Sequence, residues 1–469
     1  MASDWLHHPL TETVLALERR ELSPVDLMEA TLSRIEAQNE KVNAFVALRD
    51  GELLLTEARQ AEERIARGEG RALEGVPLGV KDLEDAAGMI TSKGSVPFKD
   101  NLAERDSLQV ERLRGAGAIV VGKTNAPEFG YTAITKNLLF GATHNPWNLE
   151  RTPGGSSGGS SAAIAAGMIA LATASDGGGS VRLPATFTGC FGLKTSYGRI
   201  PHGPDSHWVM GDTAVHGPLT RTVADAALHL DVAAGPHPLD PNSLPHPGFS
   251  YREVLDRLPD GLRFGYSPDL GYAVVQSDLA EVVAEAAQAF VELGHRLEAI
   301  PDGPPELGRD WGLGNSFEML GKLAHLLPES EREFGRTFIQ GTKAGAHMTP
   351  ERYARQAEQR EALNRWCAEV FERCDLLLTP TVPYDPPPAR GPFPTELEGR
   401  ALPWASVASF TIPFNLSWHP AATVRAGFSK AGLPVGLQIV GPRHRDDLVL
   451  QAAHAFEQAR PWSHEWPEL

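Results

Sequence analysis

The chain has 469 residues, with 43 Lys and Arg against 60 Asp and Glu, and its formal net charge is −17. This acidic balance argues against a nucleic-acid-binding protein, which needs a basic face, and against docking on anionic lipid. With 42% hydrophobic residues, the chain can bury a large core without disulfides.

Cysteines are few, and their spacing matches neither a disulfide framework nor a zinc site, so no metal is predicted; they are Cys190, Cys367 and Cys374. Their scarcity is typical of a reducing compartment. The first residues lack the basic and apolar runs of a signal peptide. The apolar stretch Ala162–Ala174 is shorter than the about 20 residues of a membrane span. We therefore predict a cytoplasmic protein with no membrane partner.

The first quarter of the chain predicts helices. Ser23 followed by Pro24 is typical of a helix N-terminus, and apolar residues then recur at helical spacing up to Ile35. The segment Glu52–Arg67 predicts a second amphipathic helix, which Gly68 ends.

Short apolar strands then alternate with helices, which is typical of a mixed α/β fold around a buried sheet. The predicted strands are 76–80, 118–121, 170–173, 262–266, 376–378 and 433–440. The predicted helices are 107–115, 162–169, 222–234, 277–293 and 447–458. The proline-rich segments 236–247 and 380–394 predict loops, and the polar, helical region 302–365 predicts an insertion or cap over the core.

One glycine motif matches a phosphate-binding loop. Gly117 and Gly122-Lys123-Thr124 have the required spacing. The four residues between the glycines are Ala-Ile-Val-Val, which favour a strand, whereas a phosphate cradle needs a loop with inward backbone N–H groups. We interpret this motif as a strand and not as a nucleotide site.

A second motif, Gly155–Gly159, matches the G-x-S-x-G elbow that would make Ser157 a nucleophile. An elbow follows directly on a strand, but the residues before this one contain an Asn-Pro step, a Thr-Pro step and charged residues, which predict a loop. A flexible Gly/Ser linker is the other interpretation. It is weakened because both flanks resemble packed core.

The third motif is Asp176-Gly177-Gly178-Gly179-Ser180-Val181-Arg182. Consecutive glycines allow backbone N–H groups to turn towards one point, as an oxyanion hole requires, with Ser180 at its edge; a tight strand-to-helix turn is an equal alternative. Lys81, at the end of an apolar strand, gives the motif more weight. A buried lysine has a lowered pKa and can replace histidine as the base for a serine nucleophile.

Together these segments resemble the amidase signature family. The block Asn145–Ser160 continues to Asp176–Ala185, and the upstream segment Gly75–Asp82 resembles the family's lysine motif. Segments 115–125, 411–415 and 432–438 are similar as well. The resemblance covers most of the chain and is weakest over 236–370. It implies an α/β fold with one amidase-signature-type domain over 1–469: a mixed sheet flanked by helices, a signature core at about 70–235 and a helical cap.

The resemblance also implies a Ser–Ser–Lys triad without a cofactor. Ser180 would be the nucleophile, Lys81 the base and Ser156 the bridging serine, on a cis peptide with Ser157. Backbone N–H groups would form the oxyanion hole; they belong to Gly177, Gly178, Gly179 and Ser180. Asp176 and Arg182 would brace the loop, Ser157 would be structural, and Tyr131 would line the acyl pocket or pack in the core.

The implied activity is hydrolysis of an amide to an acid and an amine, with a small apolar or aryl amide as the expected substrate. Urethane or ester hydrolysis by the same triad is an alternative, and an amidotransferase subunit or an inactive binding protein are others. The run Pro127–Gly130 departs from the acidic–Phe–Ala–Met run expected of the amidotransferase branch. The family usually has a larger residue at Gly177, which leaves the substrate preference open, and a homodimer stays open as well.

Overall fold

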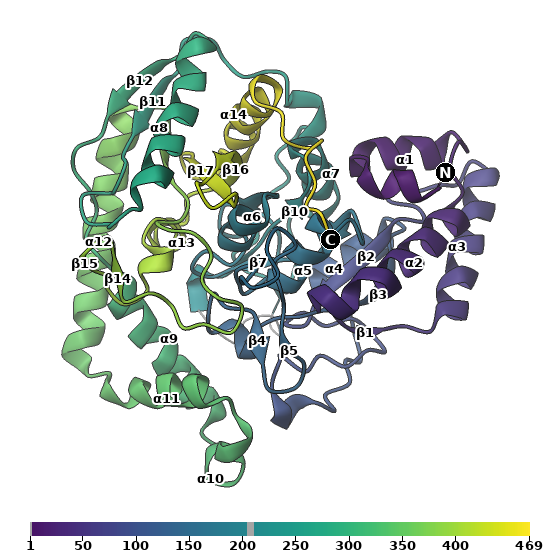
Figure 1. Ribbon diagram of the computed structural model, residues 1–469, viewed down its shortest axis with the longest axis horizontal. Helices are drawn as coiled ribbons and strands as arrows, with labels where there is room; N and C mark the ends of the chain where they lie inside the picture. Colours follow the sequence, from purple (N-terminus) through teal and green to yellow (C-terminus); the bar gives the residue numbers. More distant parts are fainter. Residues whose placement is uncertain (1, 204–210) are drawn as a thin grey trace.

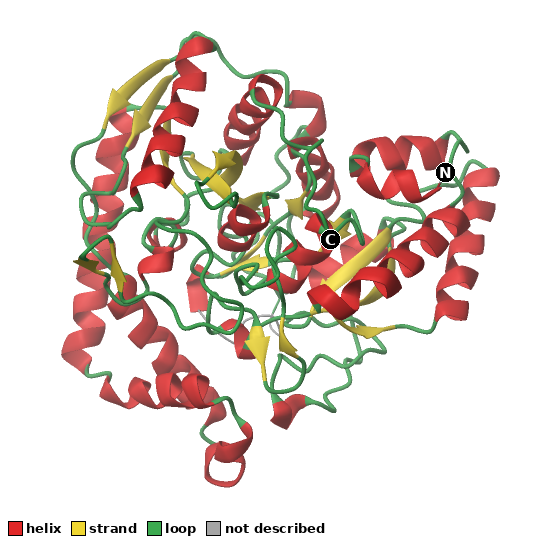
Figure 2. Ribbon diagram, in the orientation of Figure 1, coloured by secondary structure: helices red, strands yellow, loops and turns green. Residues whose placement is uncertain are grey.

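The computed structural model describes residues 2–203 and 211–469. Its centre is an 11-stranded mixed sheet (Figures 1 and 2). In spatial order the strands are β1 (Phe45–Leu48), β3 (Ile119–Thr124), β2 (Pro77–Lys81), β6 (Leu171–Ala172), β10 (Leu219–Thr220), β8 (Phe191–Lys194), β16 (Ala421–Phe428), β17 (Pro434–Val440), β13 (Leu376–Pro380), β11 (Arg263–Tyr266) and β12 (Arg296–Ala299). The α/β fold with a mixed sheet is therefore confirmed.

Helices flank this sheet. Those that contact one another or the sheet are α1 (Leu10–Glu18), α2 (Pro24–Val42), α3 (Gly51–Ala66), α4 (Leu108–Gly115), α5 (Gly158–Ala165), α6 (Arg182–Thr188), α7 (Val223–Ala233), α8 (Ser277–Glu292), α12 (Pro350–Arg373) and α14 (Asp446–Ala459). The N-terminal helices α1–α3 lie at one side of the molecule in Figure 1. As predicted, Ser23 caps α2, because its hydroxyl accepts the Val25 N–H.

The strands that position the site run parallel. β2 pairs with β3 on one side and with β6 on the other, both in parallel. The carboxyl ends of these strands therefore meet at one edge of the sheet, where ligands bind in α/β folds. Lys81 is the last residue of β2, and Thr124 is its register partner at the end of β3.

Three further helices form what we call the cap helices: α9 (Gly308–Leu323), α10 (Leu327–Ser330) and α11 (Arg336–Ala344). In Figure 1 they lie below the main body, with α10 furthest from it. They pack on the body through a separate hydrophobic cluster that includes Phe129, Met319 and Phe338. The predicted helical character of this region is confirmed.

Most predicted elements coincide with observed ones, and the errors have physical reasons. α5 begins at Gly158, four residues before its predicted start, because full burial against the sheet overrides the low helix propensity of two glycines. Strands β1, β8, β10, β12 and β16 of the central sheet were not predicted. β16 begins with two alanines, which are depleted in strands, and its eight residues are held by pairing with β8 and β17.

Candidate active site

Lys81 lies at the end of β2 with its side chain completely buried. Its Nζ lies 2.8 Å from Ser156 Oγ, 2.8 Å from Ser157 Oγ and 3.0 Å from Ser175 Oγ, and it also donates to the Ser175 carbonyl. Burial lowers the pKa of Lys81 to about 7, although Glu84 and Asp176 oppose the shift. An amine surrounded by hydroxyls and close to neutrality in pKa can both accept and return a proton.

Ser156 and Ser157 lie in the loop that leads into α5. The cis peptide bond joins Gly155 to Ser156, so the predicted position between Ser156 and Ser157 was wrong by one residue. The residue before Ser156 is a glycine, and a Cβ there would lie 2.9 Å from the Thr132 carbonyl oxygen, so the close packing of this loop admits only glycine. Ser157 Oγ contacts both Lys81 and Ser175.

Ser180 lies just before α6 and next to Ser157. Its carbonyl accepts the Ser157 N–H at 3.3 Å, and 9% of its surface is exposed, in contrast to the fully buried Lys81. Within residues 2–203 and 211–469, Ser180 Oγ has no hydrogen bond. The structure thus joins Lys81 directly to Ser156 and places Ser180 beside Ser157, but Ser180 and Ser156 are not hydrogen-bonded to each other.

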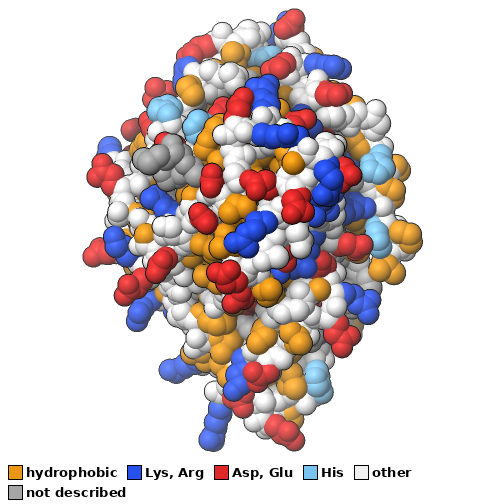
Figure 3. Space-filling model, turned by 90° about the vertical axis from the view of Figure 1, so that its right-hand side faces the viewer, with side chains coloured by type: hydrophobic (Ala, Val, Ile, Leu, Met, Phe, Trp, Pro, Cys, Tyr) orange, Lys and Arg blue, Asp and Glu red, His pale blue; other side chains and the backbone are white. Residues whose placement is uncertain are grey.

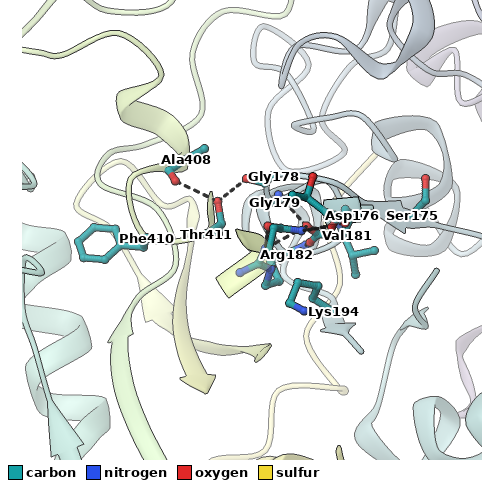
Figure 4. Close-up of polar contacts among 12 residues, drawn as sticks. Ser175, Asp176, Gly178, Gly179, Val181, Arg182, Lys194, Ala408, Phe410 and Thr411 are labelled. Carbon is teal, nitrogen blue, oxygen red and sulfur yellow. Dashed lines mark hydrogen bonds and ion pairs between the residues drawn. The ribbon is translucent and has the colours of Figure 1, made fainter. Parts of the chain in front are cut away.

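The glycine loop before Ser180 has one peptide plane fixed at both ends. The Gly178 carbonyl accepts the Thr411 hydroxyl at 2.7 Å, and the Gly179 N–H donates to Asp176 Oδ1 at 2.7 Å (Figure 4). Gly179 N–H is therefore directed away from the predicted oxyanion hole. The N–H groups of the other three predicted donors have no acceptor in the described chain; they belong to Gly177, Gly178 and Ser180.

Asp176 and Arg182 form a fully buried ion pair at 2.9 Å. The Arg182 guanidinium also donates to Asn415 Oδ1 and Gln438 Oε1, and Asn415 donates back to Asp176 Oδ1. Although burial opposes it, the combined effect of Arg182 and Asn415 lowers the pKa of Asp176 well below its ordinary value. The carboxylate thus stays charged and holds the ends of the glycine loop together.

Aromatic contacts link the cap helices to the body of the molecule. A Cβ placed on Gly178 would lie 2.6 Å from the ring of Trp311 on α9, so the indole rests directly on this glycine. Tyr131 Oη lies 3.2 Å from Ser316 Oγ on the same helix, and its ring meets Phe338 of α11 edge-on at 5.4 Å. Tyr131 therefore contacts the cap helices, next to the loop that carries the site.

The competing motifs have structural roles. The segment that matches a phosphate-binding loop is strand β3, as interpreted, and Lys123 is buried, with its Nζ donating to the Glu84 carbonyl and to Thr91 Oγ1. Residues 152–157 are loop, so no strand leads directly into Ser157 and the elbow interpretation lacks its structural context. Among the described residues, no cluster of His, Cys, Asp and Glu side chains could hold a metal ion, and none of the helices has the length and apolar character to cross a membrane.

Sequence reasoning missed several residues that complete the site. Ser175 has no signal of its own, because its contact with Lys81 depends on pairing of the short strand β7 (Ser175–Asp176) with β9 (Val215–His216). Thr411, Asn415 and Gln438 lie in segments that resemble the family, which was a usable signal. Their roles needed the structure, because Asn415 is 239 residues from the carboxylate it contacts.

Comparisons with known proteins agree with this geometry. Residues 26–450 match the amidase family. The chain is 38% identical to an acylamidase of Rhodococcus erythropolis, covering 97% of this chain and 96% of that protein. It is 34% identical to a glutamyl-tRNA(Gln) amidotransferase subunit of Geotalea daltonii, covering 95% and 96%. A bacterial aryl acylamidase structure superposes with a TM-score of 0.91 at 30% identity, covering 97% of each chain.

Proposed function

Because the chain belongs to the amidase signature family, we propose that it is a serine hydrolase that cleaves the C–N bond of small apolar or aryl amides through an acyl-enzyme on Ser180. The observation that carries the proposal is the buried Lys81 amine, with a pKa lowered to about 7 and Ser156 Oγ at 2.8 Å. A lysine with an ordinary pKa would keep its proton at neutral pH and could not act as a base.

In the proposed reaction, neutral Lys81 accepts the proton of Ser156 while Ser156 accepts the proton of Ser180. Ser180 Oγ then attacks the amide carbonyl and forms a tetrahedral oxyanion. The relay bond between Ser180 and Ser156 forms when substrate binds, since catalytic hydrogen bonds tighten in the substrate complex.

The N–H groups of Gly177, Gly178 and Ser180 stabilise the oxyanion, and each such donor contributes about 3 kcal/mol to transition-state binding. The protons return along Ser156 to the leaving amine, which departs, and water hydrolyses the acyl-enzyme by the same relay in reverse. Asp176 takes no proton, because its pKa is held low by Arg182 and Asn415. Its role is to hold the loop.

An apolar or aryl substrate is supported by the Trp311 ring beside Gly178 and by Tyr131, which contacts the same helix through Ser316. Two of the similar proteins are an acylamidase and an aryl acylamidase, which agrees with this choice. A carbamate carbonyl gives the same tetrahedral oxyanion, so urethane hydrolysis is a second activity for the same residues. The similarity to amidotransferase subunits supports a further candidate, which the Pro127–Gly130 run disfavours.

The test is release of 4-nitroaniline from 4-nitroacetanilide at about pH 8, with an aryl carbamate assayed in parallel. We expect Ser180→Ala and Lys81→Ala each to lose at least about 10³-fold in kcat/KM. Lys194→Met is the matched control. Lys194 is equally buried and has a pKa of about 7, but its Nζ donates to the Thr195 carbonyl and not to the relay serines.

Lys194→Met should keep activity within about tenfold, provided that its melting curve shows a folded protein. If Ser180→Ala retains activity, or if a fluorophosphonate fails to label Ser180 in an otherwise active preparation, the acyl-enzyme proposal is wrong. Activity that appears only with glutamine and copurified partners would favour the amidotransferase candidate.

A further inference from the structure

The segment 128–131 connects the cap helices to the active site. Glu128 is buried, and its carboxylate accepts hydrogen bonds from two directions. Ser95 Oγ donates to Oε1 at 2.6 Å from the body, and the Gly335 N–H donates to Oε2 at 2.8 Å from the start of α11. A buried carboxylate needs such donors, since burial without them is costly.

The next three residues continue the connection. Phe129 stacks on Phe338 of α11, with ring centroids 5.2 Å apart and an interplanar angle of 16°. Gly130 lies against the proposed relay serine, because a Cβ on this residue would lie 3.1 Å from Ser156 Oγ. Tyr131 then contacts α9 through Ser316. Four consecutive residues thus contact the cap helices and the proposed relay serine.

The cap helices also contact the other half of the site. Trp311 of α9 rests on Gly178, whose carbonyl accepts the Thr411 hydroxyl. A movement of α9 would therefore move the Trp311 ring relative to Gly178. Through this contact the position of the cap helices is linked to the glycine loop.

We propose that Glu128 is a positioning residue that anchors the cap helices and thereby sets the size of substrate admitted beside Gly178. The proposal rests on the proposed function of Ser180. Glu128 takes part in no chemical step. Its carboxylate holds α11 through Gly335, α11 packs with α9, and the Trp311 ring of α9 forms one wall of the proposed substrate site beside Gly178. In the structure α9 and α11 contact each other directly.

The test compares Glu128→Ala and Glu128→Gln in the full-length chain. Amide hydrogen exchange over residues 308–344 reports the anchor without requiring activity. Steady-state kinetics with 4-nitroacetanilide and its decanoyl homologue measure how the length of the acyl chain affects kcat and KM. For Glu128→Ala we expect exchange to accelerate in the cap helices by about tenfold or more, and KM for the short substrate to rise about tenfold with a smaller change in kcat.

The ratio of kcat/KM for the short substrate to kcat/KM for the decanoyl substrate should also fall, because the Trp311 ring would no longer be held against Gly178. Glu128→Gln should restore much of the native behaviour, since its amide oxygen can still accept the Gly335 N–H. Should Glu128→Ala fail to fold, Gly335→Pro acts from the other side: the φ of Gly335 is already −59°, so proline removes the donor and leaves Glu128 intact.

Glu331→Gln is the control, because Glu331 belongs to the cap region but its side chain pairs with the exposed Lys343. Unchanged exchange in Glu128→Ala or, if it does not fold, in Gly335→Pro, would overturn the anchor. Faster exchange with unchanged kinetics for both substrates would overturn the coupling to the site. If the native chain neither cleaves the anilide nor is labelled by a fluorophosphonate, the proposed function is wrong. The hydrogen-exchange result would still show whether Glu128 anchors the cap helices.

Discussion

The glycine loop around Ser180 and the cap helices that cover it are stabilised in different ways. Hydrogen bonds between fully buried charged and amide groups hold the loop, with Asp176 and Arg182 at its centre. The cap helices pack through an apolar cluster around Phe338, and the buried Glu128 carboxylate accepts the Gly335 N–H at the start of α11. The ion pair between Lys343 of α11 and Glu331, which follows α10, is about half exposed.

The difference indicates a division of labour within one molecule. A proton relay and an oxyanion hole need fixed geometry, which buried networks provide because each lost partner leaves an uncompensated charge or donor. A wall that determines substrate size tolerates looser contacts. On the face drawn in Figure 3, acidic and basic side chains are interspersed. Exposed ion pairs in general contribute little to stability.

The largest effect on stability is expected for Asp176→Asn. The change preserves shape but leaves the buried Arg182 guanidinium without its counter-charge, which costs about 3–5 kcal/mol in free energy of unfolding. Activity should also fall at least about 100-fold, because the Gly179 N–H loses a charged acceptor. Denaturant unfolding and anilide hydrolysis measure the two effects, and a loss of stability below about 1 kcal/mol would show that the network is not the main support of the loop.

The pH profile sharpens the comparison, since the proposed base, Lys81, lies in the buried site and not in the cap helices. Lys81 has a pKa of about 7 and acts as a base in its neutral form. We therefore expect kcat/KM to fall about tenfold per pH unit below about pH 7 and to level off above it. Lys194 also has a pKa of about 7, so the same limb must persist in Lys194→Met. Its disappearance there would assign the limb to Lys194.

The candidate site residues stand out in the sequence more clearly than the residues around them, and the reason is the range of the contacts. Ser156 and Ser180 lie in dense Gly/Ser motifs whose composition alone signals an unusual backbone, and Lys81 ends an apolar strand where a charge is unexpected. Ser175 carries no such signal, because its role arises from strand pairing. The direction of the Gly179 N–H was also beyond sequence reasoning, since it depends on where Asp176 points.

In the cap region the helical character was predictable, whereas the contacts with the site were not. Its helical character was predicted from the sequence, but nothing local to Trp311 or Phe338 indicates that they meet residues 178 and 129. Such contacts join distant parts of the chain and depend on the packing of whole helices. The proposed anchor at Glu128 was for the same reason invisible: a glutamate after Asn-Ala-Pro has the composition of an exposed turn.

A moderate effect is expected at the boundary between the two regions, for Thr411→Val. The variant keeps the shape of the side chain and removes the hydroxyl that donates to the Gly178 carbonyl. The glycine peptide would then be fixed at one end only, so kcat should fall about tenfold while KM changes little, because the oxyanion exists only in the transition state. Steady-state kinetics decide this, and an equal rise in KM would mean that Thr411 shapes substrate binding.

The smallest effect is expected for Glu331→Gln, which repeats the acid-to-amide change of Asp176→Asn in the cap region. The Glu331 and Lys343 side chains are 47% and 50% exposed, so water and salt screen their attraction, and ordering two long side chains opposes it. The free energy of unfolding should change by no more than about 0.5 kcal/mol, and that small change should shrink further in about 0.5 M salt. A loss approaching that of Asp176→Asn would contradict the contrast between the regions, since it would mean that an exposed pair on the cap supports the fold as strongly as the buried network under Ser180.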